Sequence, residues 1–289
     1  MPDATRIDAH HHHWDLAQRD QPWIDDAMSA IRRDFSMDDL VAASAAAGVT
    51  RSVVVHTPAV LAETEELLEL AEQHAMIAGV VGWLDLTAES VADDVARLQQ
   101  LAAGGRLVGI RHLVQAEPAD WLRRPDVRRG LRTLGDAGLS FDLLTLPHQL
   151  AAALDAVRVA DGTTFVVDHC SKPAIRSGEI DEWAEQLREI SREPNTWCKL
   201  SGLTTEADWA RWSVDDLRPY VDVVLEAFGP DRLMFGSDWP VCLLATDYTG
   251  WVAAVDDLTA GLSPDEQRSL WHGAASAAYR LTDPTGGAR

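Results

Sequence analysis

Four consecutive histidines, at positions 10 to 13, stand near the start of this 289-residue chain, and their spacing indicates chemistry. If residues 7–13 form a strand, His10 and His12 leave it on the same face as Asp8. Their Cα atoms are then roughly 7 Å apart, because a strand rises about 3.3 Å per residue. Both rings can therefore reach one metal ion or one substrate oxygen. A purification tag would be the ordinary explanation for such a run, but this one lies inside a β-like segment.

The other face of this strand is expected to pack against helices on the outside of the fold. It carries, in order, Ile7, Ala9, His11 and His13. A shift in register by one residue would exchange the two faces. We therefore expect that His11 and His13 do not both face the site.

Further polar side chains follow apolar segments along the chain. The segments end in His56, Arg111, His112, Asp142, His169, Lys199 and Asp238. A single buried histidine is more often a satisfied core residue than a ligand, but so many polar ends are difficult to attribute to packing alone. The chain has only two lysines, Lys172 and Lys199, and both lie at or just beyond such an end.

Alternating strand and helix patterns are expected to bring these ends together. The expected strands cover residues 7–13, 51–56, 77–86, 107–113, 140–144, 164–169, 196–202 and 232–240. Eight apolar strands separated by helices predict an α/β fold, a (β/α)8 TIM barrel in one domain over residues 1–289. An open doubly wound sheet is the alternative, but no Gly-rich turn follows the first strand. In a barrel, the C-terminal ends of the strands form one face, where active sites are built.

Composition excludes several classes of partner. The net charge of -21 and the pI near 4.7 argue against nucleic acid and against an anionic membrane surface. No apolar run approaches the roughly 20 residues of a membrane span, and no signal-like segment opens the chain. Three widely spaced cysteines indicate reduced thiols and a cytoplasmic protein. The oligomeric state stays open, and a homo-oligomer is compatible with the sequence.

Several segments together carry a resemblance to a known family. They are residues 7–15 (IDAHHHHWD), 109–112 (GIRH), 165–173 (FVVDHCSKP), 198–203 (CKLSGL) and 228–240 (FGPDRLMFGSDWP). The chain resembles the amidohydrolase superfamily, and within it the amidohydrolase-2 group that contains sugar lactonases. The resemblance spans nearly the whole chain. It implies a barrel whose reaction centre is formed by four residues, His10, His12, His169 and Asp238.

The expected activity is hydrolysis of a sugar-acid lactone, an aldonolactone such as a fuconolactone or rhamnonolactone, by attack of water. Asp238 is expected to be the general base. The residues expected to polarise the carbonyl, directly or through one divalent ion that Asp238 also binds, are His10, His12 and His169. Zn²⁺ is the expected ion, with metal-free catalysis as the alternative. The residues expected to bind the substrate are Trp14, Arg111, His112 and Trp239.

The sequence departs from the two-metal members of the superfamily. They carry a bridging Lys or Glu on the fourth strand and a His on the fifth, where this chain has Arg111, His112 and Asp142. A site with one metal ion or none is therefore expected. Two other functions stay open, namely metal-dependent decarboxylation or hydration of a small carboxylic acid on the same barrel, and a barrel that binds without catalysis.

Overall fold

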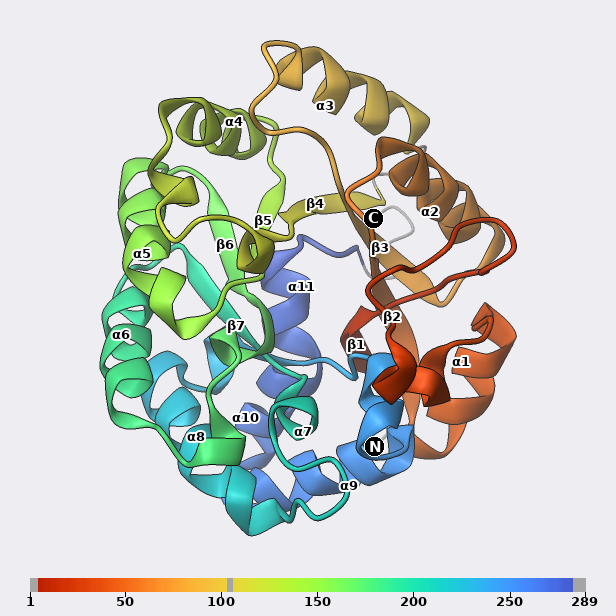
Figure 1. The fold of residues 1–289 in the computed structure, drawn as a ribbon, viewed down its shortest axis with the longest axis vertical. Coiled ribbons are helices and arrows are strands. Elements are labelled where there is room, and N and C mark those ends of the chain that lie inside the picture. The colour runs from red at the N-terminus through yellow and green to blue at the C-terminus, as the bar shows by residue number, and fades with distance from the viewer. Residues whose placement is uncertain (1–4, 103–105, 283–289) are drawn as a thin grey trace, which may run out of the picture.

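The computed structural model describes residues 5–102 and 106–282. Eight parallel strands pair in chain order around a barrel that helices surround (Figure 1). The strands are β1 Arg6–His11, β2 Val49–Val55, β3 Ile77–Gly82, β4 Leu107–His112, β5 Ser140–Leu143, β6 Thr164–Val167, β7 Thr196–Leu200 and β8 Leu233–Phe235. The predicted (β/α)8 barrel is confirmed.

The helices lie between and after the strands. They are α1 Met37–Ser44, α2 Leu61–Gln73, α3 Val91–Leu101, α4 Pro125–Asp136, α5 Leu150–Val159, α6 Asp181–Ser191, α7 Leu203–Glu206, α8 Val214–Phe228, α9 Tyr248–Leu258, α10 Pro264–Arg268 and α11 Ala274–Ala278. None of the helices in the described residues combines the length and the apolar composition needed to cross a membrane.

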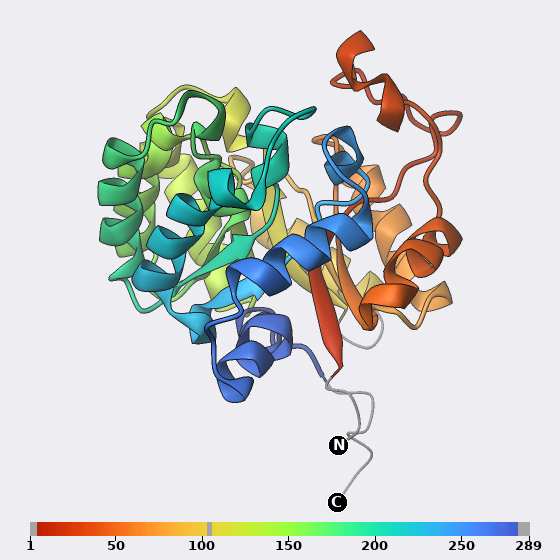
Figure 2. The ribbon, with the colours of Figure 1, turned by 90° about the horizontal axis from the view of Figure 1, so that it is seen from below.

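Apolar side chains form two layers, one between the strands and the helices and one inside the barrel. On β2, for example, Val54 belongs to the outer layer, whereas its neighbours Val53 and Val55 belong to the inner one. Ile7 and Ala9 also belong to the inner layer, together with residues of the C-terminal helix α11. This helix lies across the end of the barrel opposite the site, beside the start of β1 (Figure 2). The expectation that Ile7 and Ala9 face the outer helices is therefore wrong.

A β-bulge in β1 explains this difference. The pairing advances by three residues on β1, from Asp8 to His11, while it advances by two on β2. Ala9 and His10 consequently both point into the barrel, whereas Asp8 and His11 point outward. His11 contacts Ser52 of β2 there, with 3.0 Å between Nε2 and Oγ. Such bulges redirect side chains beside active sites. Strict alternation would place Asp8 and His10 on the same face, but with the bulge His10 points into the barrel while Asp8 points outward.

The barrel closes between β8 and β1 through a short contact that follows β8. The Asp238 N–H donates to the His10 carbonyl at 2.8 Å, and the His12 N–H donates to the Trp239 carbonyl at 2.7 Å. These bonds join the first and the last strand at their C-terminal ends. Two segments far apart in the chain thus meet at one edge, which is where the site is formed.

Candidate active site

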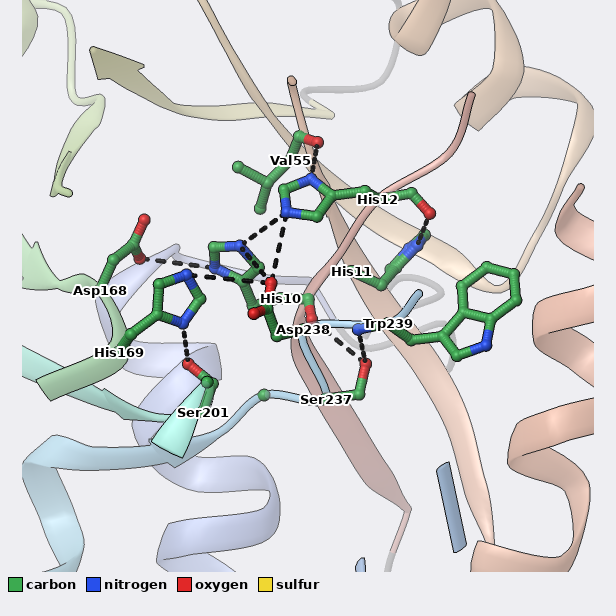
Figure 3. A network of polar contacts seen from close by, with 12 residues as sticks. His10, His11, His12, Val55, Asp168, His169, Ser201, Ser237, Asp238 and Trp239 are labelled. Carbon is green, nitrogen blue, oxygen red and sulfur yellow. Dashed lines mark hydrogen bonds and ion pairs between the residues drawn. The ribbon is translucent and has the colours of Figure 1, made fainter. Parts of the chain in front are cut away.

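Four side chains gather at the C-terminal ends of the strands, and we refer to His10, His12, His169 and Asp238 as the His–Asp cluster (Figure 3). One carboxylate oxygen of Asp238, Oδ1, lies 3.4 Å from Nε2 of His12, 3.7 Å from Nε2 of His10 and 3.9 Å from Nε2 of His169. His10 is fully buried and the other three are at most 5% exposed. The structure thus brings together the four residues that the sequence assigned to the reaction centre.

Asp8 holds the backbone around Asp238. Its Oδ1 accepts hydrogen bonds from the backbone N–H of Ser237 at 2.8 Å and of His10 at 3.1 Å, and its Oδ2 accepts one from the Tyr248 hydroxyl at 3.0 Å. Asp238 itself has a left-handed backbone with a φ of 54°, which costs a residue with a side chain roughly 1–2 kcal/mol. The outward-facing Asp8 therefore fixes β1, the segment after β8 and helix α9 to one another.

His169 lies in an unusual turn after β6. Four successive residues have a positive φ although none of them is a glycine. They are His169, Cys170, Ser171 and Lys172, with φ values of 51°, 53°, 58° and 50°. Strained conformations of this kind persist where the surrounding structure fixes them, and they cluster at functional sites. Here the Trp183 indole donates to the Cys170 carbonyl at 2.8 Å, and His169 Nδ1 lies 2.8 Å from Ser201 Oγ.

Gly202 packs against the ring of His169. A Cβ at this position would lie 2.7 Å from the His169 Nδ1, and the glycine has a φ of 66° that side chains disfavour. The end of β7 thus supports the ring on one side.

A network of buried charges lies beneath His10. The Lys199 ammonium is 2.5 Å from Asp142 Oδ2, 2.9 Å from Asp168 Oδ1 and 3.1 Å from His10 Nδ1. The hydroxyl of Tyr279 donates to Asp142 at 2.8 Å. Burial raises the pKa of Asp142 to about 6, with Lys199 opposing the rise. Burial alone would raise the pKa of Asp168 as well, but Lys199 and His10 outweigh it and hold this pKa well below its usual value.

Asp142 and Lys199 stand out in the sequence as polar strand ends, but no role could be predicted for them or for Asp168. The available signal was a charged residue within an otherwise apolar strand. What the sequence could not supply was the partner of each charge, because Asp142 lies on β5, Asp168 directly follows β6 and Lys199 lies on β7.

The structure brings Arg111 to the His–Asp cluster. Its side chain is 3% exposed, and its Nη1 lies 3.4 Å from both Asp168 Oδ2 and His10 Nε2. The guanidinium also donates to the carbonyl of His56. Arg111 therefore adds a fixed positive charge beside the cluster.

His112, the other strand-four residue assigned to substrate binding, is engaged elsewhere. Its Nδ1 accepts a hydrogen bond from the Trp83 indole at 3.1 Å, and its Nε2 lies 2.9 Å from Glu117 Oε1. The ring also stacks on Trp121, with 4.3 Å between centroids and 6° between planes. Both ring nitrogens thus have partners outside the His–Asp cluster.

Trp14 and Trp239 are both 3% exposed. The Trp14 ring lies beside His12, with 6.4 Å between centroids, and its indole N–H donates to the Arg33 carbonyl at 2.8 Å. The Trp239 ring packs edge-on against Phe35 at 5.2 Å, and it points away from Asp238 (Figure 3). The substrate-binding role of both rings stays a prediction.

The electrostatics of the cluster favour an ionised Asp238 carboxylate beside two neutral imidazoles, those of His10 and His169. Burial by itself would raise the pKa of Asp238, but His169 and His12 outweigh it, and the net shift is downward. Burial lowers the pKa of His169 to about 4 and that of His10 well below its usual value. At neutral pH, Asp238 can therefore accept a proton, while His10 and His169 are uncharged.

The donor atoms of the cluster also fit one metal ion. His10, His12 and Asp238 each offer an atom within 4.8 Å of the others, and a second set contains His10, Asp168 and His169. His12 Nδ1 lies 2.7 Å from the Val55 carbonyl, so this nitrogen must carry the proton. Its Nε2 lone pair then faces the cluster, as in histidines that ligate a metal.

Comparisons with known proteins agree with this arrangement. The chain matches the protein-family model described as amidohydrolase over residues 7–281, a range that includes the whole cluster. An L-fucono-1,5-lactonase from Burkholderia multivorans is 39% identical, over 97% of this chain and 98% of its own length. Another from Burkholderia ambifaria is 37% identical, over 97% of both chains. The solved structure of an amidohydrolase from Burkholderia multivorans with bound zinc has a TM-score of 0.92 and 38% identity, over 96% of this chain and 100% of that one.

Proposed function

The chain belongs to the amidohydrolase family, and from that premise we propose that it hydrolyses a sugar-acid lactone such as a fuconolactone or a rhamnonolactone. The observation that carries the proposal is the position of one buried carboxylate oxygen facing three imidazoles. The similarity to L-fucono-1,5-lactonases over nearly the full chain supports this substrate class.

Asp238 acts as the general base in this proposal. Its lowered pKa keeps the carboxylate ionised at neutral pH, so it can take a proton from an attacking water molecule. His169, held by Ser201, and Arg111 then orient and polarise the lactone carbonyl and stabilise the negative charge that develops on its oxygen. As the bond between the carbonyl carbon and the ring oxygen breaks, Asp238 returns the proton to the ring oxygen, which leaves as an alcohol. Because an ester has a better leaving group than an amide, this activation is sufficient.

We propose that one divalent ion, most consistent with Zn²⁺, is held by His10, His12 and Asp238, with His169 next to them. Two imidazoles and one carboxylate are ligands that zinc accepts at catalytic sites. When bound, such an ion supplies Lewis acidity to the carbonyl oxygen. The neighbouring carboxylates of Asp142 and Asp168 are already paired with Lys199, and Asp168 also with Arg111.

Cytoplasmic location stays part of the proposal. The structure supports it through three buried cysteines that are free thiols, Cys170, Cys198 and Cys242. Among the partners expected from the sequence, the small-molecule lactone is the one that the similarity to L-fucono-1,5-lactonases supports.

A screen of aldonolactones with a pH indicator, run together with metal analysis of the same preparation, tests the function. Asp238→Asn keeps the shape of the side chain but removes its basicity, and we expect the rate of ring opening to fall by at least about 10²-fold with lactone binding mostly retained. Near-normal turnover would mean that another group activates the water. Release of CO₂ without ring opening would favour the decarboxylase alternative instead.

A further inference from the structure

We propose that Lys172 and Glu206 form a hydroxyl-binding pair beside the reaction centre, and that this pair recognises two neighbouring hydroxyl groups of the sugar lactone. The inference rests on the proposed lactone hydrolysis and assigns its preference for polyhydroxylated rings to two residues. Neither residue belongs to the His–Asp cluster or to the charge network below it.

The left-handed turn after β6 positions Lys172. Its backbone N–H donates to the His169 carbonyl at 2.8 Å, which closes a turn of four residues, from His169 to Lys172. Residues three apart in such a turn leave it on the same side. Lys172 therefore extends beside His169, and the positive φ values of the turn are what direct both side chains to the same place.

Glu206 reaches the same place from another strand. It ends the short helix α7, which begins directly after the glycine that packs on the His169 ring. Its Oε1 lies 3.7 Å from the Lys172 ammonium nitrogen. Burial raises the pKa of Glu206, Lys172 opposes the rise, and the negative charge of Asp238 adds to it, so the two carboxylates lie within electrostatic reach.

The exposure of the pair fits a role in binding. The side chains of Lys172 and Glu206 are 24% and 26% exposed, whereas those of His10, His169 and Asp238 are at most 6% exposed. The pair thus forms the more open edge of a centre that is otherwise nearly closed. A substrate whose carbonyl reaches Asp238 would place its ring substituents toward this edge.

The separation within the pair leaves bonding capacity for a ligand. At 3.7 Å the ion pair is longer than a charge-assisted hydrogen bond of about 2.7–2.9 Å. Ammonium hydrogens and carboxylate lone pairs are therefore left for other partners. A hydroxyl group can donate to Glu206 while its neighbour on the ring accepts from Lys172. Vicinal hydroxyls of a sugar lactone offer this combination of donor and acceptor.

The choice of lysine supports a specific role. Of 25 cationic side chains only two are lysines, and the other, Lys199, is fully buried beneath His10. The chain thus uses arginine at all its other cationic positions. A compact ammonium presents donors in several directions, whereas the planar guanidinium matches a carboxylate instead. The ammonium is therefore the better hydrogen-bond donor for a hydroxyl group next to Glu206.

Two lactones with the same six-membered ring test the pair. L-fucono-1,5-lactone carries hydroxyl groups on its ring, and δ-valerolactone carries none. In Glu206→Gln and Lys172→Met, we expect kcat/KM for the fuconolactone to fall by roughly 10- to 100-fold, the range for a hydrogen bond to a charged group. Most of the fall should be in KM. The ratio of kcat/KM between the two lactones should fall by a similar factor, because δ-valerolactone makes neither bond.

An exposed ion pair between the outer helices α6 and α8 provides the control. Glu226 lies 2.7 Å from Arg188 on the outer helices, and Glu226→Gln should leave both the ratio and the individual constants unchanged. The double variant of Lys172 and Glu206 should lose less than the product of the single losses, since the two residues bind adjacent groups. Thermal melts of each variant report on folding independently of activity.

Equal losses with both lactones would overturn the inference, because they would indicate a structural role for the pair. Unchanged kcat/KM for the fuconolactone in both variants would overturn it too, since it would mean that solvent alone contacts the two side chains. Either result would leave the lactonase proposal standing. If the wild-type protein opened neither lactone nor any other aldonolactone, the proposed function itself would fail, and the inference with it.

Discussion

Replacement of Asp8 by alanine should destabilise the protein and disturb the reaction centre at the same time. The carboxylate is fully buried and accepts three hydrogen bonds, two from backbone N–H groups and one from the hydroxyl of Tyr248. Asp8→Ala leaves all three donors without a partner in a place that water does not reach. Tyr248→Phe is a matched control, because it removes one of the three bonds and leaves the backbone donors satisfied.

The expected magnitude follows from these contacts. Each buried donor left unsatisfied costs about 1–3 kcal/mol, which gives at least about 3 kcal/mol for three of them. The largest losses in this range are not expected, because burying the Asp8 carboxylate itself costs free energy that Asp8→Ala recovers. The rise of the Asp8 pKa to about 6 reflects this cost of burial. We expect a loss of about 3–5 kcal/mol for Asp8→Ala and of about 1 kcal/mol for Tyr248→Phe. In a chain of this size, the larger loss should lower Tm by roughly 5–10 °C.

Equilibrium unfolding in urea measures both losses, and steady-state kinetics measure the effect on the site. Since Asp8 anchors the residue before Asp238, Asp8→Ala should lower kcat more than it raises KM, whereas Tyr248→Phe should change both only slightly. A free energy of unfolding for Asp8→Ala within about 1 kcal/mol of that for Tyr248→Phe would refute the reasoning. It would show that the backbone donors find other partners and that Asp8 does not hold the strand ends together.

Three further outcomes follow from the same structure. Burial raises the pKa of Glu63 to about 7, so the folded protein holds this proton at a pH where the unfolded chain has lost it, and stability falls as pH rises. Between about pH 5 and pH 8, urea titrations should show the wild type losing up to about 3 kcal/mol more than Glu63→Gln, and equal losses would contradict the shift. His11→Ala should leave turnover largely intact because its ring lies outside the barrel, whereas His12→Ala should remove most of it, and comparable kinetic losses would mean that the register is different. Gly202→Ala should cost roughly 1–2 kcal/mol in backbone strain alone and lower kcat by pushing against His169, and a melt and a rate like those of the wild type would argue against that contact.

Local sequence patterns predicted most of the architecture. The capping pair of Ser36 and Asp39 starts α1, and Gly48, with a left-handed backbone, ends the short 3-10 turn that follows this helix; both are signals within a few residues of sequence. The apolar strand segments and the helices between them predicted the barrel. When strands and helices alternate along a chain, few other folds bury the apolar faces of both. The barrel in turn predicted that the C-terminal strand ends meet. Asp238, more than 200 residues from His10, was therefore assigned to the same site as His10 from the sequence alone.

The details within the site depended on contacts between distant strands. Strict alternation placed Asp8 on the face of His10, but the pairing of β1 with β2 introduces a bulge that turns Asp8 outward to bind helix α9. Likewise, the sequence showed Lys199 at a strand end without revealing that it lies between two aspartates from other strands. Composition and periodicity act over a few residues and so determine the elements and their order. Register, bulges and the partners of buried charges are decided by long-range pairing, which exists only once the barrel has closed.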